Sequence, residues 1–299
     1  MKNLFKISFF LLLISLWLLS GCQRNLNDTI FPPTLTLIPA SQTPSATQTA
    51  IASETPTPSP TPTITPSPTL VYLTVPAGPV QVPILLYHHV SAEIHYNRYN
   101  VDPAVFDDQM KWLSDNGYRT MNVSDLANVI LAGGQIPLRP VLITFDDGDM
   151  DVYQNAFPIL KKYGFTATFY VVNDYIGGKD MVTINELTDL IQNGWEIGSH
   201  SSNHLSLTAQ GVDINTEIHG SKVELQNKLG VTINSFAYPF GEINPEVVTR
   251  TINFGYSSAV GLGESIMHDR WSLFYLTRIE IQNAYSMDKF ISYFPWQNP

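Results

Sequence analysis

Two adjacent carboxylates and a pair of histidines are the residues of this chain whose types and spacing could do hydrolytic chemistry. Asp146 and Asp147 directly follow one apolar run, and His200 and His204 follow another. One carboxylate with two imidazoles is the ligand set of a catalytic divalent-metal site that keeps a position open for water. The cation would acidify this water for attack on a carbonyl group. The second carboxylate would then be free to accept the proton as a general base.

Each of these motifs alone is common in ordinary protein structure. Asp146-Asp147-Gly148 and Tyr238-Pro239-Phe240-Gly241 are both typical turn sequences. The spacing of His200 and His204 puts both imidazoles on one side of a single helical turn, which is often only a surface feature. The motifs indicate a site only in combination, because each of them directly follows an apolar run.

The elements that must position these motifs alternate along the chain. We expect strands at 83–87, 141–145, 167–172, 195–199, 233–238, 256–260 and 276–281. We expect helices from Asp102-Pro103 to Gly117 and at 126–131, 152–163, 184–192, 213–229, 245–253 and 286–293. This alternation predicts βαβ units and a parallel sheet. About seven units in roughly 220 residues favour an α/β fold that is a distorted, incomplete (β/α) barrel.

A barrel of this kind would bring the motifs together. All parallel strands end at the same rim, where active sites of such barrels are built. The Asp146-Asp147 pair, the His200–His204 segment, Tyr238–Gly241 and the pair His88-His89 each follow a different expected strand. The sequence therefore predicts one polar site assembled from four separate segments.

The N-terminal residues have the pattern of an export signal. Lys2 and Lys6 precede an apolar run that is too short for a comfortable membrane span. The run ends in Leu19-Ser20-Gly21-Cys22, which resembles the bacterial lipobox, and Cys22 is the only cysteine. By this resemblance residues 1–21 are a lipoprotein signal peptide and Cys22 becomes the acylated first residue. A plain signal peptide is the alternative.

A long linker separates this signal from the folded part. Of the 29 residues from Ser41 to Thr69, 21 are Ser, Thr or Pro, so the expected linker at 22–78 cannot bury enough surface to fold. We expect the catalytic domain at 79–299. The net charge of -10 argues against nucleic acid as a partner, and no protein partner is inferable.

Three motifs together resemble a known enzyme family. Thr144–Gly148, His200–His204 and Phe236–Gly241 are similar to the first three motifs of the polysaccharide deacetylases with the NodB homology domain, carbohydrate esterase family 4. The resemblance implies a distorted (β/α) barrel that uses a divalent metal to remove N- or O-acetyl groups from glycans.

The resemblance also implies roles for individual residues. Asp146 would be the general base, and Asp147, His200 and His204 would bind the metal. The backbone N–H of Phe240 would stabilise the oxyanion. Zinc is the expected metal, although cobalt, nickel or iron would also suit two histidines and one carboxylate.

The chain departs from the family pattern at two points. Ala237 stands where most members have an arginine that holds the base, and the late Leu-x-His of the general acid is replaced by a segment ending in His268. Leu85–Val90, however, resembles the N-terminal Tyr-His motif of the subgroup that deacetylates poly-β-1,6-N-acetylglucosamine. We therefore expect His88 to be the acid, with His268 as the alternative, and Arg278 to hold the base.

Some roles remain open at this point. Tyr238 is a candidate for contact with sugar rings, with core packing as the alternative, and His89 is expected to be a packed or supporting histidine. The expected function is N-deacetylation of an N-acetylglucosamine polysaccharide by a secreted protein. We expect this protein to be lipid-anchored to the outer face of the cell membrane. In a two-membrane cell it would face the periplasm or lie on the outer membrane. Alternatives are a deacetylase of peptidoglycan or chitin-type oligosaccharides, an inactive glycan-binding member, and iron-dependent oxidation, which uses a similar ligand set.

Overall fold

A closed barrel of seven parallel strands forms the centre of the protein. The computed structural model describes residues 71–93 and 97–296, so the expected signal peptide 1–21, Cys22 and all but the last residues of the linker 22–78 lie outside the described residues. The barrel strands are β3 (Ile84–Tyr87), β8 (Pro140–Phe145), β9 (Thr168–Val171), β10 (Glu196–Ser199), β11 (Ser235–Ala237), β12 (Ser258–Leu262) and β14 (Leu276–Glu280).

The order of the strands shows how the barrel closes. They follow one another as β3-β14-β12-β11-β10-β9-β8, and β8 pairs in parallel with β3, so that Leu86 lies opposite Thr144. The distortion is at β8, whose C-terminal half pairs with β9 while its first residues pair with β6 (Arg119–Thr120). The expected α/β barrel of about seven units is confirmed, and in the described residues it is closed rather than incomplete.

The barrel strands are apolar because both of their faces are covered. In β3, Leu85 and Tyr87 belong to a core cluster shared with the surrounding helices, whereas Ile84 belongs to a second cluster formed by other barrel strands and α2. Successive side chains of a strand point to opposite faces. A strand buried on both faces therefore appears in the sequence as an unbroken apolar run, which is why the strand positions were predictable.

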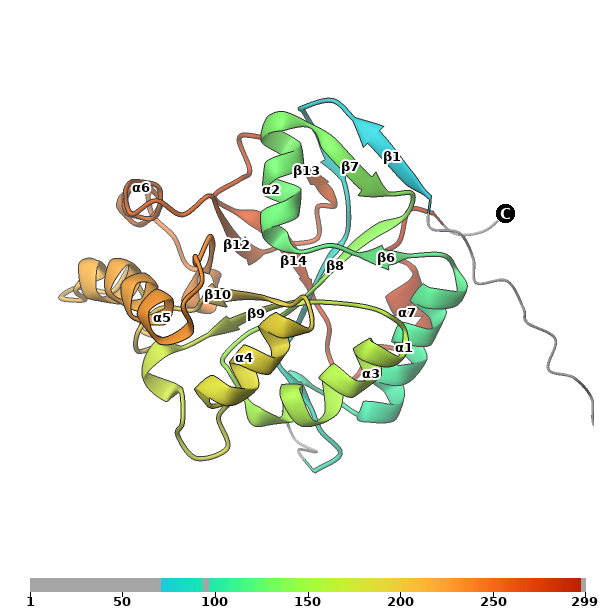
Figure 1. Cartoon of the computed structure of the whole chain (residues 1–299), viewed down its shortest axis with the longest axis horizontal. Coiled ribbons are helices and arrows are strands. Elements are labelled where there is room, and N and C mark those ends of the chain that lie inside the picture. The colour runs from blue at the N-terminus through green and yellow to red at the C-terminus, as the bar shows by residue number, and fades with distance from the viewer. Residues whose placement is uncertain (1–70, 94–96, 297–299) are drawn as a thin grey trace, which may run out of the picture. The chain divides into compact units, whose positions relative to one another are not determined.

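Helices lie around the outside of the barrel (Figure 1). They are α1 (Pro103–Asp115), α2 (Val123–Ala132), α3 (Phe157–Lys162), α4 (Ile184–Gln192), α5 (Ser221–Leu229), α6 (Pro245–Asn253) and α7 (Met287–Ile291). Capping side chains set where they begin: the Asp102 carboxylate accepts a hydrogen bond from Ala104 N at 2.8 Å. Within the described residues, none of the helices is both long and apolar enough to cross a membrane.

Two of the expected helices begin with a π-helical turn instead of an α-helical one. The expected helix 152–163 is a π-helix, η1 (Val152–Ala156), followed by α3, and the expected helix 213–229 is a π-helix, η3 (Asn215–Gly220), followed by α5. In η3, side chains from other segments donate to the backbone carbonyls: Ser202 Oγ to Thr216 O at 3.0 Å and Tyr256 Oη to Ile218 O at 3.0 Å. These tertiary contacts compete with regular α-helical hydrogen bonding, and apolar spacing does not reveal them.

One end of the barrel is covered by apolar structure. Leu126 and Ile130 of α2 pack with Ile84 and Leu142, which lie at the beginning of the strands. Beyond α2 lie two small antiparallel pairs, β1 (Tyr72–Val75) with β7 (Gly134–Pro137) and β2 (Val80–Gln81) with β13 (Met267–His268). Strand β1 falls inside the expected linker 22–78, so the folded part begins before residue 79.

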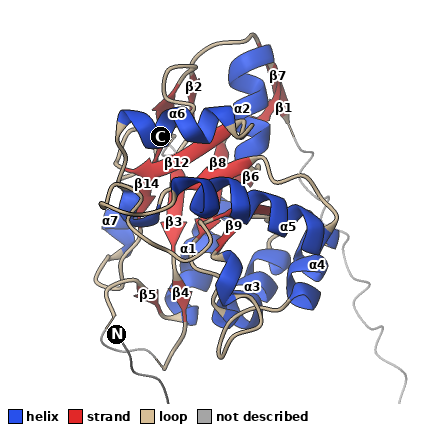
Figure 2. Cartoon of the chain, turned by 90° about the vertical axis from the view of Figure 1, so that its left-hand side faces the viewer, coloured by secondary structure: helices blue, strands red, loops and turns tan. Residues whose placement is uncertain are grey.

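The other end of the barrel is built differently. Here β4 (His89–Val90) follows β3 after a single residue and pairs with β5 (Asn100–Val101). Figure 2 shows β1, β7 and β2 at one end of the sheet and β4 and β5 at the opposite end. The carboxyl ends of the barrel strands are therefore free of the apolar cover that closes their beginnings.

Candidate active site

A cleft of about 300 Å³ opens at the carboxyl ends of the barrel strands. This is the rim where (β/α) barrels carry their active sites. The residues that line the cleft come from the segments after several different strands. They are Leu86, His88, His89, Asn97, Arg98, Tyr99, Asp146, Asp147, His200, His204, Tyr238, Phe240, Gly241, Leu262, Arg278 and Glu280.

Asp147, His200 and His204 form a cluster with the geometry of a metal site. One possible ligand atom from each residue lies within 4.8 Å of the other two. Asp147 Oδ1 is 3.6 Å from His200 Nε2 and 3.5 Å from His204 Nε2. Two ligands about 2.1 Å from a tetrahedral cation are about 3.4 Å apart, so these separations fit a single divalent ion. Three protein ligands also leave a coordination position for water or substrate.

The surroundings of His200 favour the neutral form of its imidazole ring. Its Nδ1 lies 2.9 Å from Ala237 O, and because a carbonyl oxygen only accepts, Nδ1 carries the proton and Nε2 is bare. Burial lowers the pKa of His200, although the carboxylates of Asp146 and Asp147 act in the other direction. The neutral imidazole that a metal requires is therefore the favoured form.

The backbone of the site is held in unusual conformations. Among the described residues other than glycine, only five have positive φ, and three of them are Asp147 at 73°, His204 at 56° and Phe240 at 60°. A non-glycine residue in this region costs of order 1–3 kcal/mol and persists only when its surroundings enforce it. Such outliers gather at functional sites, so their positions here support a site at this rim.

The segment that carries the two histidines is a loop and not the expected helical turn. Ser201 also has a positive φ, of 68°, and its Oγ accepts a hydrogen bond from His204 N at 2.9 Å. Glu217 of η3 accepts two hydrogen bonds from Asn203, from N at 2.9 Å and from Nδ2 at 3.0 Å. The expectation of helical geometry was wrong, because these contacts fold the segment back, yet the two imidazoles still meet.

Asp146 is buried and bound by Arg278. The two guanidinium nitrogens Nη1 and Nη2 donate to Asp146 Oδ1 and Oδ2 at 2.6 and 2.7 Å, and Asp146 is 3% exposed. Burial alone would raise the pKa of Asp146, but the charge of Arg278 and the hydrogen bonds that it donates outweigh burial and hold the pKa at about 2. Asp146 is thus ionised at neutral pH.

Arg278 comes from the strand that was expected at 276–281 and that the structure places at Leu276–Glu280. Arg278 lies in β14, next to β3 in the barrel, and its Nε donates to Gly261 O at 3.2 Å. Ala237 occupies the position at which most members of the family that the motifs resemble have arginine, and it is fully buried. The guanidinium thus reaches the carboxylate from another strand of the closed barrel.

His88 lies in the cleft beside the carboxylates. Its ring packs on Tyr99 with the ring centroids 4.7 Å apart, and its Nδ1 is buried without a hydrogen-bond partner among the described residues. Burial lowers the pKa of His88, and the nearby Asp146 and Asp147 partly offset this. A lowered pKa makes the protonated ring a stronger acid, but it also reduces the fraction of rings that carry the proton at neutral pH.

His268, the alternative acid, lies at the opposite end of the barrel. It is in β13, opposite Val80 of β2, and its Nε2 donates to Val82 O at 3.1 Å. Burial lowers the pKa of His268 to about 4. Since it does not line the cleft, its place in the fold favours His88.

Phe240 and Tyr238 occupy different environments although they are neighbours. Phe240 is 57% exposed and its ring centroid lies 4.6 Å from that of His204, so its side chain packs against one histidine of the cluster. Tyr238 lines the cleft, but its side chain is 1% exposed and packs against Phe236. The roles of the Phe240 N–H and of Tyr238 remain predictions.

Some cleft residues had no recognisable signal in the sequence. Arg98 and Tyr99 come from the loop between β4 and β5, and Glu280 ends β14. The Arg98 guanidinium lies 4.5 Å from the centre of the Tyr99 ring. No motif marks this loop, and only the pairing of β4 with β5 brings it to the cleft.

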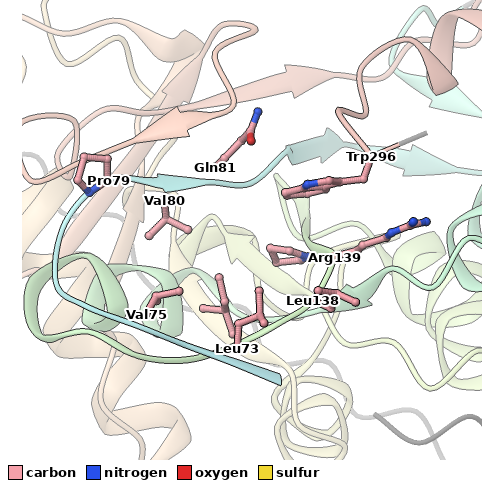
Figure 3. Close-up of a pocket in the computed structure, with 10 residues that line it drawn as sticks. Leu73, Val75, Pro79, Val80, Gln81, Leu138, Arg139 and Trp296 are labelled. Carbon is pink, nitrogen blue, oxygen red and sulfur yellow. The ribbon is translucent and has the colours of Figure 1, made fainter. Parts of the chain in front are cut away.

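A second cavity, of about 440 Å³, lies at the other end of the barrel (Figure 3). The side chains of Leu73, Val75, Val80 and Leu138 surround it, and Arg139 is its one charged lining residue. It contains no carboxylate or histidine among its lining residues. This larger cavity offers no hydrolytic chemistry.

The family model that matches this chain and two similar proteins all carry descriptions as deacetylases of polysaccharides. The family model described as polysaccharide deacetylase matches residues 134–259. YxkH of Bacillus subtilis, named as a candidate polysaccharide deacetylase, is 32% identical over 216 residues, covering 72% of this chain and 76% of YxkH. The poly-β-1,6-N-acetyl-D-glucosamine N-deacetylase of Staphylococcus aureus is 27% identical, covering 64% of this chain and 71% of that protein.

Solved structures agree with this assignment. The Streptococcus pyogenes deacetylase PplD, solved in complex with acetate, has a TM-score of 0.66 at 28% identity, covering 73% of this chain and all of that one. The polysaccharide deacetylase BC0361 of Bacillus cereus has a TM-score of 0.64 at 26% identity, covering 72% of this chain and 69% of that one. From its barrel, its motifs and these relatives, the chain belongs to the polysaccharide deacetylase family with the NodB homology domain.

Proposed function

We propose that this protein is a metal-dependent hydrolase that removes N-acetyl groups from an N-acetylglucosamine polysaccharide at the cell surface. One observation carries the proposal: the cluster of Asp147, His200 and His204 lies beside an ionised carboxylate, Asp146, that Arg278 holds with two hydrogen bonds. A cation bound by the cluster, most simply zinc, would supply Lewis acidity for a water and for the acetyl carbonyl.

The first chemical role belongs to Asp146. Its carboxylate accepts a proton from the water that attacks the acetyl carbonyl. Arg278 keeps the carboxylate ionised and fixes the direction of its oxygens. Phe240 lines the same cleft, and its N–H donates to the oxygen on which negative charge develops.

The second role belongs to His88. As the carbon–nitrogen bond breaks, its imidazolium donates a proton to the departing sugar amine, and acetate is the other product. The packing of Tyr99 on the His88 ring restricts the direction of this proton transfer. Asp146 and His88 thus provide the base and the acid from two strand ends of one cleft.

The substrate class is inferred from the relatives. A polymer of β-1,6-linked N-acetylglucosamine is favoured, because the Staphylococcus aureus relative is named for that substrate and the chain shares the Tyr87-His88 motif of that subgroup. The proposed location is the outer face of the membrane, through lipidation of Cys22. That residue lies outside the described part of the chain.

Acetate release is the direct test of the proposed function. Protein beginning at residue 23, which lacks the lipidated cysteine, would be incubated with poly-β-1,6-N-acetylglucosamine, peptidoglycan and chitin oligomers. We expect acetate from the first substrate, loss of activity with a chelator, and recovery with zinc. Asp146→Asn is the matched control, because it removes the base but keeps the size of the side chain. Acetate release that persists in both the chelated protein and this variant contradicts the proposal.

A further inference from the structure

His89, the neighbour of the proposed acid, lines two cavities. It is part of the wall of the cleft described above and also of an adjoining cavity of about 550 Å³ that contains Asp149 and Asp151. The sequence suggested a packed or supporting histidine at this position. Its half-buried place between the two cavities is different from that of a core residue.

The two ring nitrogens of His89 have different environments. Nδ1 lies 3.0 Å from Asp151 Oδ2 and 3.6 Å from Asp149 Oδ2. Nε2 has no hydrogen-bond partner among the described residues, and this atom is not buried. The ring is thus held by one nitrogen, and the other nitrogen is accessible.

The backbone around His89 is held as firmly as its ring. His89 N donates to Tyr99 O at 3.2 Å, and Val90 N donates to the second Asp151 oxygen at 3.4 Å. Asn155, in the π-helix η1, donates from Nδ2 to Val90 O at 2.7 Å. Asp151 immediately precedes this π-helix, so one segment fixes both the backbone of β4 and the imidazole.

The charge of the ring favours hydrogen-bond donation. The hydrogen bond with Asp151 raises the pKa of His89, against burial, and the carboxylates of Asp149 and Asp147 act in the same direction as Asp151. A carboxylate at Nδ1 keeps a proton on that nitrogen. Protonation of the ring then places a second N–H on Nε2, the accessible atom.

We propose that His89 binds the glycan, with its Nε2–H donating to an oxygen of the sugar chain where the cleft meets the adjoining cavity, and that Asp151 is a positioning residue for this contact. The substrate class rests on the proposed function. A glycan suits the site because its hydroxyl, ring and amide oxygens all accept hydrogen bonds. The proposal extends the substrate contacts beyond the reacting acetyl group.

Binding of a short β-1,6-linked N-acetylglucosamine oligosaccharide tests this proposal. Affinity of the full-length protein would be measured by calorimetry with a chelator present, so that the ligand is not consumed. A charge-assisted hydrogen bond predicts that His89→Ala weakens binding by about tenfold or more. His89→Gln, which keeps an N–H donor, should recover part of the affinity. His219→Ala, at an exposed histidine outside the cleft, is the matched control.

The role of Asp151 needs a readout that a loss of folding would not produce. In Asp151→Asn, the pKa of the His89 ring should be lower than in the wild-type protein, which nitrogen NMR would measure. The affinity for the oligosaccharide should fall by about threefold. Unchanged affinity in His89→Ala, or no binding by the wild-type protein, overturns the proposal. Binding that depends on His89 without acetate release from any glycan overturns the proposed function and not this contact.

Discussion

The two ends of the barrel carry similar features with different chemistry. Each has a cavity, of about 300 Å³ at the carboxyl ends of the strands and about 440 Å³ at their beginnings. Each also has a buried histidine: His200 directly follows β10 at the carboxyl ends, and His268 lies in β13 at the other end. The carboxylates of Asp146 and Asp147 lie beside the ring of His200, whereas the ring of His268 donates to a backbone carbonyl oxygen. Neither cavity size nor a buried histidine therefore identifies the site by itself.

The backbone explains part of this difference. Side chains that follow parallel strands gather at one rim, and turns at this rim hold Asp147, His204 and Phe240 in the left-handed region. At the other end, apolar side chains of α2 such as Leu126 and Ile130 are buried against the beginnings of the strands. The beginnings of the strands are therefore covered by apolar packing, and the carboxyl ends carry the polar, left-handed turns.

Removal of a proposed ligand should produce the largest effect. His200→Ala should lower acetate release by at least about 10³-fold and reduce bound zinc, because two ligands hold the ion less well and the Lewis acid is lost. Elemental analysis and an acetate assay measure both. His219→Ala, an exposed histidine, should change neither, and a His200→Ala protein with normal zinc content and rate would refute the site.

Arg278→Ala should have the next largest effect. Loss of one partner of a buried ion pair should lower the free energy of unfolding by about 3–5 kcal/mol and activity by roughly 10²-fold. Without the guanidinium, burial should raise the pKa of Asp146 above its value of about 2. Because the base works only when ionised, activity should then be lost at a higher pH as the solution is acidified.

The comparison variant for this prediction is Arg278→Lys, which keeps the charge but not the paired hydrogen bonds. We expect an intermediate rate and pH profile. If Arg278→Ala folds and keeps both the rate and the pH profile of the wild-type protein, the proposed role of Arg278 is wrong.

Matched histidine variants at the two ends sharpen the comparison. His88→Gln should reduce the turnover rate by roughly 10²-fold, since glutamine cannot supply the proton to the amine. His268→Gln should change it by less than about twofold, because His268 is in β13, away from the cleft. The opposite ranking of the two rates would transfer the acid role to His268.

His268 should instead influence stability in a narrow range of pH. Its folded pKa of about 4 lies below the ordinary 6.5, so the unfolded chain binds more protons between these values. Wild-type stability should therefore fall as pH decreases from about 6.5 to 4, with a contribution from His268 of up to about 3 kcal/mol. Urea unfolding at several pH values would measure it. In His268→Gln this contribution should vanish; an identical pH dependence would contradict the assignment.

Much of the fold was predictable from local pattern. The run Val141–Phe145 indicated β8, and the helix 184–192 agrees with α4 at both ends. Strand β1 was missed because it directly follows the Pro-rich tract, although Tyr72 and Leu73 gave an apolar signal. The π-helical turns were missed because distant side chains cause them.

The sequence by itself determined which residue types are candidates for the chemistry, because aspartate pairs, histidines and the apolar runs before them are local features. Only the tertiary structure decided which of these side chains meet. Arg278 reaches Asp146 because the barrel closes, and His268 lies far from the site because β13 pairs with β2. His89 lines the cleft with its Nδ1 held by Asp151. Each of these contacts joins residues that are distant in the chain, and no local spacing specifies them.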